Sequence, residues 1–140
     1  MNRELLQKYI ISVLPMPAEK AAFFAEQFEP IDIPKNELLI KENKISKDTF
    51  ILESGYIRSY TFNNNGEEVT TNIFSAPCFV NDFLSFFKQQ PNSENYQCLT
   101  HCQLWTMSYE KVQICFHKYP EFREFGRMML VTNYSKLHDR

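Results

Sequence analysis

The chain has 140 residues and a formal net charge of −2, with 44% hydrophobic and 15% aromatic residues. This length fits a single domain with a proper core, and the aromatic content excludes a disordered chain. The slightly acidic balance excludes the basic stripe that nucleic-acid binding requires, and no apolar run approaches the ~18 residues that span a bilayer. Because the N-terminus is charged and carries no signal-peptide core, we expect a soluble cytoplasmic protein with four reduced cysteines.

Both ends of the chain have the apolar periodicity of helices. Residues 1–27 are predicted to form two helices separated by Pro15-Met16-Pro17. Residues 108–140 are predicted to form two more, the first capped by Ser108 and the second beginning at Pro120.

The middle of the chain, residues 28–107, alternates apolar and polar side chains as half-buried strands do, and about eight short strands are expected. The clearest are Ile31/Ile33, Leu38/Ile40, Phe50/Leu52, Tyr56–Phe62, Val69–Phe74, Tyr96–Thr100 and Leu104–Met107. Asn65-Gly66 between two of them is typical of a hairpin. The segment Cys78–Cys98 breaks the alternation with a predicted short helix, Asp82–Phe87. This order predicts a mainly β protein with flanking helices, in the form of a jelly-roll (double-stranded β-helix) barrel.

The string LIKENKISKDTFILESGYIRSY, which begins at Leu39, resembles the first half of the cyclic-nucleotide-binding domain of Crp/Fnr-type bacterial transcription regulators. That family has an aliphatic pair, a glycine, a short polar loop, an apolar strand and a second glycine. Here the pair is Leu39-Ile40, the second glycine is Gly55, and Asn43 replaces the first glycine. Asn is the next most tolerant residue of the left-handed region. The resemblance covers nearly the whole chain and implies one sensor domain, 1–140, with a C-terminal dimerisation helix.

The resemblance also implies that Cys78–Cys98 corresponds to the phosphate-binding cassette of the family. There a Gly-Glu pair precedes a short helix that offers N–H groups to the cyclic phosphate, and an Arg follows it. The Gly-Glu pair falls on Asn81-Asp82 and the Arg on Asn92, while the base-contacting positions fall on Leu137 and His138. The implied ligand-binding set is Asn81, Asp82, Phe83, Asn92, Ser93, Leu137 and His138.

Without the Arg, we expect a degenerate cassette that binds no cyclic nucleotide tightly, although a small-molecule effector remains possible. Asp82 is a candidate ribose-binding acid, but it is also a suitable N-cap for the short helix. Glu94 adds a second negative charge, and Lys88 is the only nearby cation. The cluster of Phe83, Phe86 and Phe87 is interpreted as core, with an apolar ligand as the alternative.

An apolar stripe on the last helix predicts a homodimer through that helix. The stripe consists of Phe122, Phe125, Met129 and Leu137, with Leu130 and Tyr134 left to cover the barrel. The alternative is that the apolar face packs on its own chain. We expect DNA to be a partner only through a helix-turn-helix domain that is absent from this chain.

Two other classes of protein fit the sequence less well. Cys98, His101 and Cys102 suggest a metal site, but their spacing, with no second cysteine pair nearby, is a poor zinc signature. His101, His117 and His138 are formal candidates for a haem ligand. We predict no metal, no cofactor and no enzyme, because no nucleophile–base arrangement is present. The alternatives left open are a functional cAMP- or cGMP-binding domain with atypical contacts, and a small cupin-like metalloenzyme.

Overall fold

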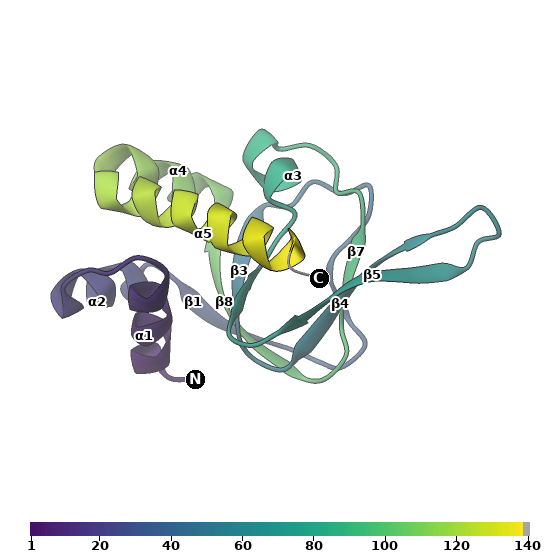
Figure 1. Ribbon diagram of the computed structural model, residues 1–140, viewed down its shortest axis with the longest axis horizontal. Helices are drawn as coiled ribbons and strands as arrows, with labels where there is room; N and C mark the ends of the chain where they lie inside the picture. The colour runs from purple at the N-terminus through teal and green to yellow at the C-terminus, as the bar shows by residue number, and fades with distance from the viewer. Residues whose placement is uncertain (139–140) are drawn as a thin grey trace. The chain divides into compact units, whose positions relative to one another are not determined.

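The computed structural model (Figure 1) describes the backbone of residues 1–138 and the side chains of residues 1–132. The chain divides into two compact units, one made of residues 1–29 and 107–140, the other of residues 30–106. No helix within the described residues has both the length and the apolar content needed to cross a membrane.

The second unit is built on eight strands in two four-stranded sheets, with strand orders β1-β8-β3-β6 and β2-β7-β4-β5. The strands are β1 (Glu29–Ile33), β2 (Leu38–Ile40), β3 (Asp48–Ser54), β4 (Tyr56–Phe62), β5 (Glu68–Ser75), β6 (Cys78–Val80), β7 (Asn95–Cys98) and β8 (Cys102–Ser108). The predicted fold class is confirmed, with one correction. The strands form two sheets that each keep two edge strands, so the predicted jelly-roll barrel is not closed.

The core of this unit comes from the inward positions of the strands, as the alternation predicts. Phe50 and Leu52 alternate along β3, and Leu104 on β8 is fully buried. The buried members are Ile40, Phe50, Leu52, Ile57, Cys78, Val80, Tyr96, Cys98, Cys102 and Leu104. Because β3, β6, β7 and β8 each contribute two buried side chains to it, the core fixes the register of the strands that carry the cassette.

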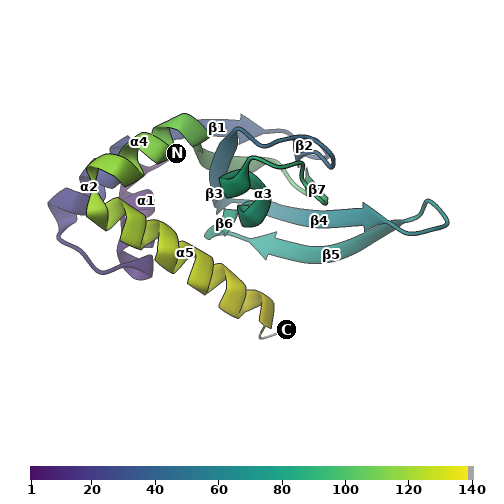
Figure 2. The ribbon, with the colours of Figure 1, turned by 90° about the horizontal axis from the view of Figure 1, so that it is seen from above.

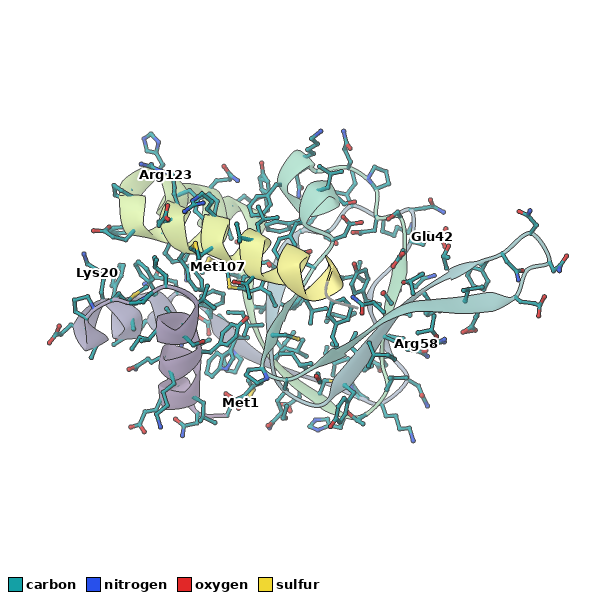
Figure 3. All side chains as sticks on the ribbon, viewed as in Figure 1. Met1, Lys20, Glu42, Arg58, Met107 and Arg123 are labelled. Carbon is teal, nitrogen blue, oxygen red and sulfur yellow. The ribbon has the colours of Figure 1, made fainter. Side chains whose placement is uncertain are left out.

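The predicted hairpin is confirmed and joins β4 to β5, which lie side by side in Figures 1 and 2. The N–H of Gly66 donates to the carbonyl of Asn63 at 3.0 Å, and Gly66 has a φ of +77°. Arg58 of β4, labelled in Figure 3, reaches across the hairpin to the carboxylate of Glu68 and lies over the ring of Tyr60 at 4.1 Å. The contact with Glu68 ties β4 to β5.

The first unit contains four helices: α1 (Arg3–Val13), α2 (Ala18–Glu26), α4 (Tyr109–Lys118) and α5 (Pro120–His138). Ser108 caps α4, since its Oγ accepts a hydrogen bond from the N–H of Lys111 at 3.2 Å. The helix α5 begins at Pro120, as predicted. At the start of the chain, Asn2 caps α1 by accepting from the N–H of Glu4 at 2.8 Å.

The predicted dimer stripe on α5 requires a correction. Phe122, Phe125 and Met129 are at most 3% exposed, so they are not available to a second chain. The ring of Phe122 lies 4.8 Å from that of Phe24 on α2, and Met129 Sδ accepts from the hydroxyl of Tyr9 on α1 at 3.9 Å. The apolar face therefore packs on the N-terminal helices of its own chain. The side chain of Leu137 lies outside the described residues.

Candidate functional site

The predicted cassette is a short helix, α3 (Phe83–Lys88), between β6 and β7. Asp82 caps it, because its Oδ1 accepts a hydrogen bond from the N–H of Ser85 at 3.2 Å. Its Oδ2 accepts a second one from the hydroxyl of Ser93 at 3.2 Å. The structure therefore brings Asp82 and Ser93 together, but both oxygens of the acid already have partners inside the protein.

The helix N-terminus also offers few free donors. The N–H of Ser85 is held by the Asp82 side chain, and the N–H of Phe86 donates to the Asp82 carbonyl at 2.9 Å. The second bond is the ordinary first bond of the helix, so the cap consumes one of the groups that would attract an anion at this end, the N–H of Ser85. Only the N–H groups of Phe83 and Leu84 remain in the first turn.

Asn81 stands where the family has glycine, and it is 4% exposed. Its Nδ2 donates to the hydroxyl of Thr49 on β3 at 3.1 Å. Its Oδ1 is buried without a hydrogen-bond partner among the described residues. The side chain thus fills space that a glycine would leave open, and it anchors the start of the cassette to the neighbouring strand.

Asn92 was predicted to stand where the family has arginine, and its amide faces a loop of the protein. We call this loop, residues 41–48, the lysine loop. Asn92 Nδ2 donates to the carbonyl of Lys44 at 2.5 Å and to the hydroxyl of Ser46 at 2.9 Å. Its own N–H donates to the same Lys44 carbonyl at 2.9 Å, and its carbonyl accepts from the N–H of Asn43 at 2.8 Å. The residue is 2% exposed and holds the loop against the end of the cassette.

The lysine loop has the backbone shape that the sequence predicts. Asn43 has a φ of +68°, the left-handed conformation that we expected of an Asn in place of the family's glycine. The side chain of Gln89, the last residue of the α3 turn, donates to the carbonyl of Ser46 at 2.9 Å, and Ile45 forms an isolated β-bridge with Pro91. The loop and the segment after α3 are therefore joined along their whole length.

The part of the cassette around Tyr96 carries two negative charges, those of Asp82 and Glu94. Burial raises the pKa of the Tyr96 hydroxyl well above its usual range, and the charges of Asp82 and Glu94 raise it further. Glu94 accepts a hydrogen bond from the hydroxyl of Thr71 at 2.8 Å, which keeps the carboxylate on this side of the sheet. Lys88 is exposed on the last turn of α3. Two carboxylates near one buried phenol make a poor environment for a phosphate.

The aromatic residues of α3 serve mainly as core. Phe86 is fully buried, and its ring lies 5.2 Å from that of Phe87. Phe83 stacks on Phe79 of β6 at 5.6 Å, and it is half-buried. Leu84 points outward and is 64% exposed. Phe83 and Leu84 are therefore the apolar side chains through which the cassette presents surface to a ligand.

The described thiol and histidine side chains do not form one cluster. Cys98 and Cys102 are fully buried, whereas the ring of His101 is exposed and lies 3.0 Å from the carboxylate of Asp32. Burial raises the pKa of Cys98 to about 12, with a further contribution from Cys102. Among the described residues, no three His, Cys, Asp or Glu side chains are grouped closely enough to hold a metal ion. His117 is exposed on α4, and His138 lies outside the described side chains.

A cavity beside the lysine loop was not predicted. It has a volume of about 290 Å³ and is lined by residues from β2, the loop, β3 and Asn92. Its signal was present in the sequence as three lysines at intervals of three residues, Lys41, Lys44 and Lys47. The spacing of the lysines alone does not predict a cavity, because it does not give the shape of the loop.

Residues 30–119 match the model of the family described as "Cyclic nucleotide-binding domain", and the chain belongs to this family. No curated protein sequence matches the chain.

Solved structures share the fold at low sequence identity. A cyclic nucleotide-binding domain from Methylobacillus flagellatus is similar with a TM-score of 0.85 at 12% identity, over 99% of this chain and 81% of that one. The N-terminal domain of a transcriptional regulator from Streptomyces coelicolor is similar with a TM-score of 0.76 at 15% identity, over 96% and 93% of the two chains. The Thermus thermophilus catabolite activator protein matches with a TM-score of 0.76 at 12% identity, over 91% of this chain but 58% of its own.

Proposed function

We propose that this chain is the effector-sensing and dimerisation domain of a cytoplasmic Crp/Fnr-type transcription regulator, and that its cassette binds no cyclic nucleotide tightly. The family match and the likeness to a regulator's N-terminal domain and to a catabolite activator protein support the regulatory role. DNA would be contacted by a helix-turn-helix domain that is not among these 140 residues.

The observation that carries the proposal is the state of Asn92. The arginine of the family would neutralise a phosphate, whereas here a neutral amide donates both of its described hydrogen bonds to the lysine loop. Loss of a charge-assisted hydrogen bond costs about 1.5–3 kcal/mol, which is roughly one to two decades of affinity. Asp82 and Glu94 lower the affinity for an anion further, because both carboxylates lie near the buried Tyr96.

An effector in the cassette itself would be small and apolar, and neutral or weakly charged. Phe83 and Leu84 offer apolar surface, while Asn81 occupies the space of the family's glycine. The side chains of Leu137 and His138, two other members of the predicted ligand-binding set, lie outside the described residues. If no effector binds there, the cassette serves as packing between β6 and β7.

A homodimer through α5 would use the side that its own chain leaves uncovered. Leu130 and Val131 are 41% and 46% exposed, in contrast to the buried Phe122, Phe125 and Met129. Adjacent apolar residues in the second half of a long helix are a suitable start for a helix–helix contact. Sedimentation at tens of micromolar tests this part, since a monomer at that concentration contradicts it.

The alternative, a cyclic-nucleotide receptor with unusual contacts, is favoured by the family match alone. Isothermal titration with cyclic AMP and cyclic GMP separates the two. We expect dissociation constants in the millimolar range or no measurable heat. A value below about 10 μM would overturn the proposal. In that case Asp82→Ala should abolish binding, because the carboxylate would have to exchange its cap for a ribose hydroxyl.

A further inference from the structure

The cavity beside the lysine loop has the features of an anion site. Its ten lining residues include three lysines and one aspartate, a balance of two positive charges in a chain whose net charge is −2. Lys41, Lys44 and Lys47 form no ion pair with any described residue. Three lysines without ion-pair partners among the described residues thus lie around one concave place, where an anion would be attracted from solution.

A buried polar atom in the wall of this cavity lacks a partner. Asn92 lines the cavity, and its Oδ1 is buried without a hydrogen bond from any described residue. The orientation of the amide is fixed by chemistry, because the carbonyl of Lys44 can only accept and so must face Nδ2. The oxygen is therefore left in need of a donor. Buried polar groups without partners are uncommon, so Asn92 is an unusual residue among those that line the cavity.

The remaining wall is apolar and rigidly supported. Leu39, Ile40, Ile45 and Phe50 line it, and Ile40 and Phe50 are buried. The loop that carries the lysines is held to the segment 89–92 by hydrogen bonds and by a β-bridge. Because the backbone of the site is already fixed, a ligand would need to order only the lysine side chains.

We propose that this cavity binds a small organic anion, a carboxylate or a phosphate monoester, with an apolar body. The lysines would hold the anionic group, and the apolar wall would cover the body. A volume of about 290 Å³ lies at the lower end of ligand pockets, which limits the ligand to a small molecule. This site lies outside the cassette helix and does not depend on what the cassette binds.

The test uses ¹⁵N-labelled 140-residue protein and follows backbone amide shifts during titration. The probes are phenyl phosphate and benzoate, with inorganic phosphate and benzyl alcohol as the partial ligands that lack the ring or the charge. We expect saturable shifts in residues 41–48 and 89–92 with at least one of the two aromatic anions. Comparison of phenyl phosphate with benzoate identifies the preferred anionic group. Inorganic phosphate should bind more weakly, and benzyl alcohol should not shift these residues.

Variants separate a built site from general charge attraction. The double change K44Q/K47Q should weaken binding about tenfold or more, since it removes two charge-assisted contacts. The matched control, K88Q, removes a lysine of α3 that does not line the cavity and should leave the affinity unchanged.

Three results would overturn the inference. They are shifts that never saturate, an equal response to benzyl alcohol, and equal losses in K44Q/K47Q and K88Q. A cyclic nucleotide bound in the cassette would instead shift 82–87 and 93, so a failure of the proposed function can be told from a failure of this site.

Discussion

Replacing Asn92 by Ala tests whether this residue is a structural clamp or a ligand group. The change removes two hydrogen bonds donated by Nδ2, to the carbonyl of Lys44 and to the hydroxyl of Ser46. Each contributes about 1 kcal/mol net, so their loss costs about 2 kcal/mol. The Lys44 carbonyl keeps its bond from the Asn92 N–H, and the partly exposed Ser46 can turn to water.

Two smaller effects act on the same variant. Removal of the buried, partnerless Oδ1 relieves about 1 kcal/mol, and the space left by the amide costs about as much. The net expectation is that N92A lowers the free energy of unfolding by about 1–3 kcal/mol. For a chain of this size that corresponds to a fall in Tm of roughly 3–10 °C.

The assay is urea unfolding followed by circular dichroism, with Ser93→Ala as the matched control. Ser93 is exposed and makes a single side-chain bond, to Asp82 at 3.2 Å, so its loss should cost at most about 0.5 kcal/mol. If N92A is as stable as S93A, the amide is not a clamp and the reasoning fails.

The opposite change, Asn92→Arg, restores the residue type of the family. We expect it to destabilise the domain by about 3 kcal/mol or more and to bring no tight binding of cyclic AMP. A guanidinium at a position that is 2% exposed would be buried against the lysine loop without an anion to neutralise it. Recovery of micromolar affinity by N92R would show that the arginine alone was missing.

The remaining predictions concern the second unit and α5. Gly55→Ala should lower the free energy of unfolding by about 2 kcal/mol or more, because φ is +110° and a Cβ would lie within 2.9 Å of three atoms, two of which belong to residues 101–102. Gly66→Ala should lower it by about 1 kcal/mol in the same urea experiment, because φ is +77° but nothing lies within 4 Å of the added Cβ. The raised pKa of Cys98, about 12 against an ordinary 9, stabilises the fold below pH 9, and this contribution is lost as the pH rises from about 9 to 12. The free energy of unfolding measured across that range should fall, and Cys98→Ala should make the fall smaller. L130E/V131K should leave Tm nearly unchanged, because both side chains are exposed, but should convert the proposed dimer to a monomer in sedimentation. A dimer that persists in this variant would place the interface elsewhere.

Elements with a clear period or a cap could be predicted from the sequence. The hairpin at Gly66, the cap at Ser108 and the left-handed Asn43 are local features, since one or two residues determine each of them. The strand β6 was missed because its three residues are all buried, so no alternation marks it. The strand predicted as Tyr96–Thr100 ends earlier, at Cys98.

Features that depend on distant partners could not be predicted. The apolar stripe of α5 is visible in the sequence, but whether a second chain or its own α2 covers it depends on Phe24, which lies about a hundred residues earlier. The orientation of Asn92 is set by the carbonyl of Lys44, a contact that spans 48 residues. Asp82 was predicted as either cap or ligand because both roles need the same carboxylate, and only the position of Ser85 distinguishes them.

The loss of the family's arginine and the presence of the lysine loop are two parts of one electrostatic arrangement. Asn92 lies between a negative region, with Asp82 and Glu94, and a positive one on the loop. An arginine at this position would bring a fourth positive charge to the three lysines, and each such like-charge approach is destabilising. A neutral amide avoids that repulsion, and its two donors still bind the loop. The same side chain that we propose to weaken phosphate binding in the cassette therefore adds no further positive charge to the lysine loop, and an anion bound at the loop would be held by the part of the chain that closes the cassette.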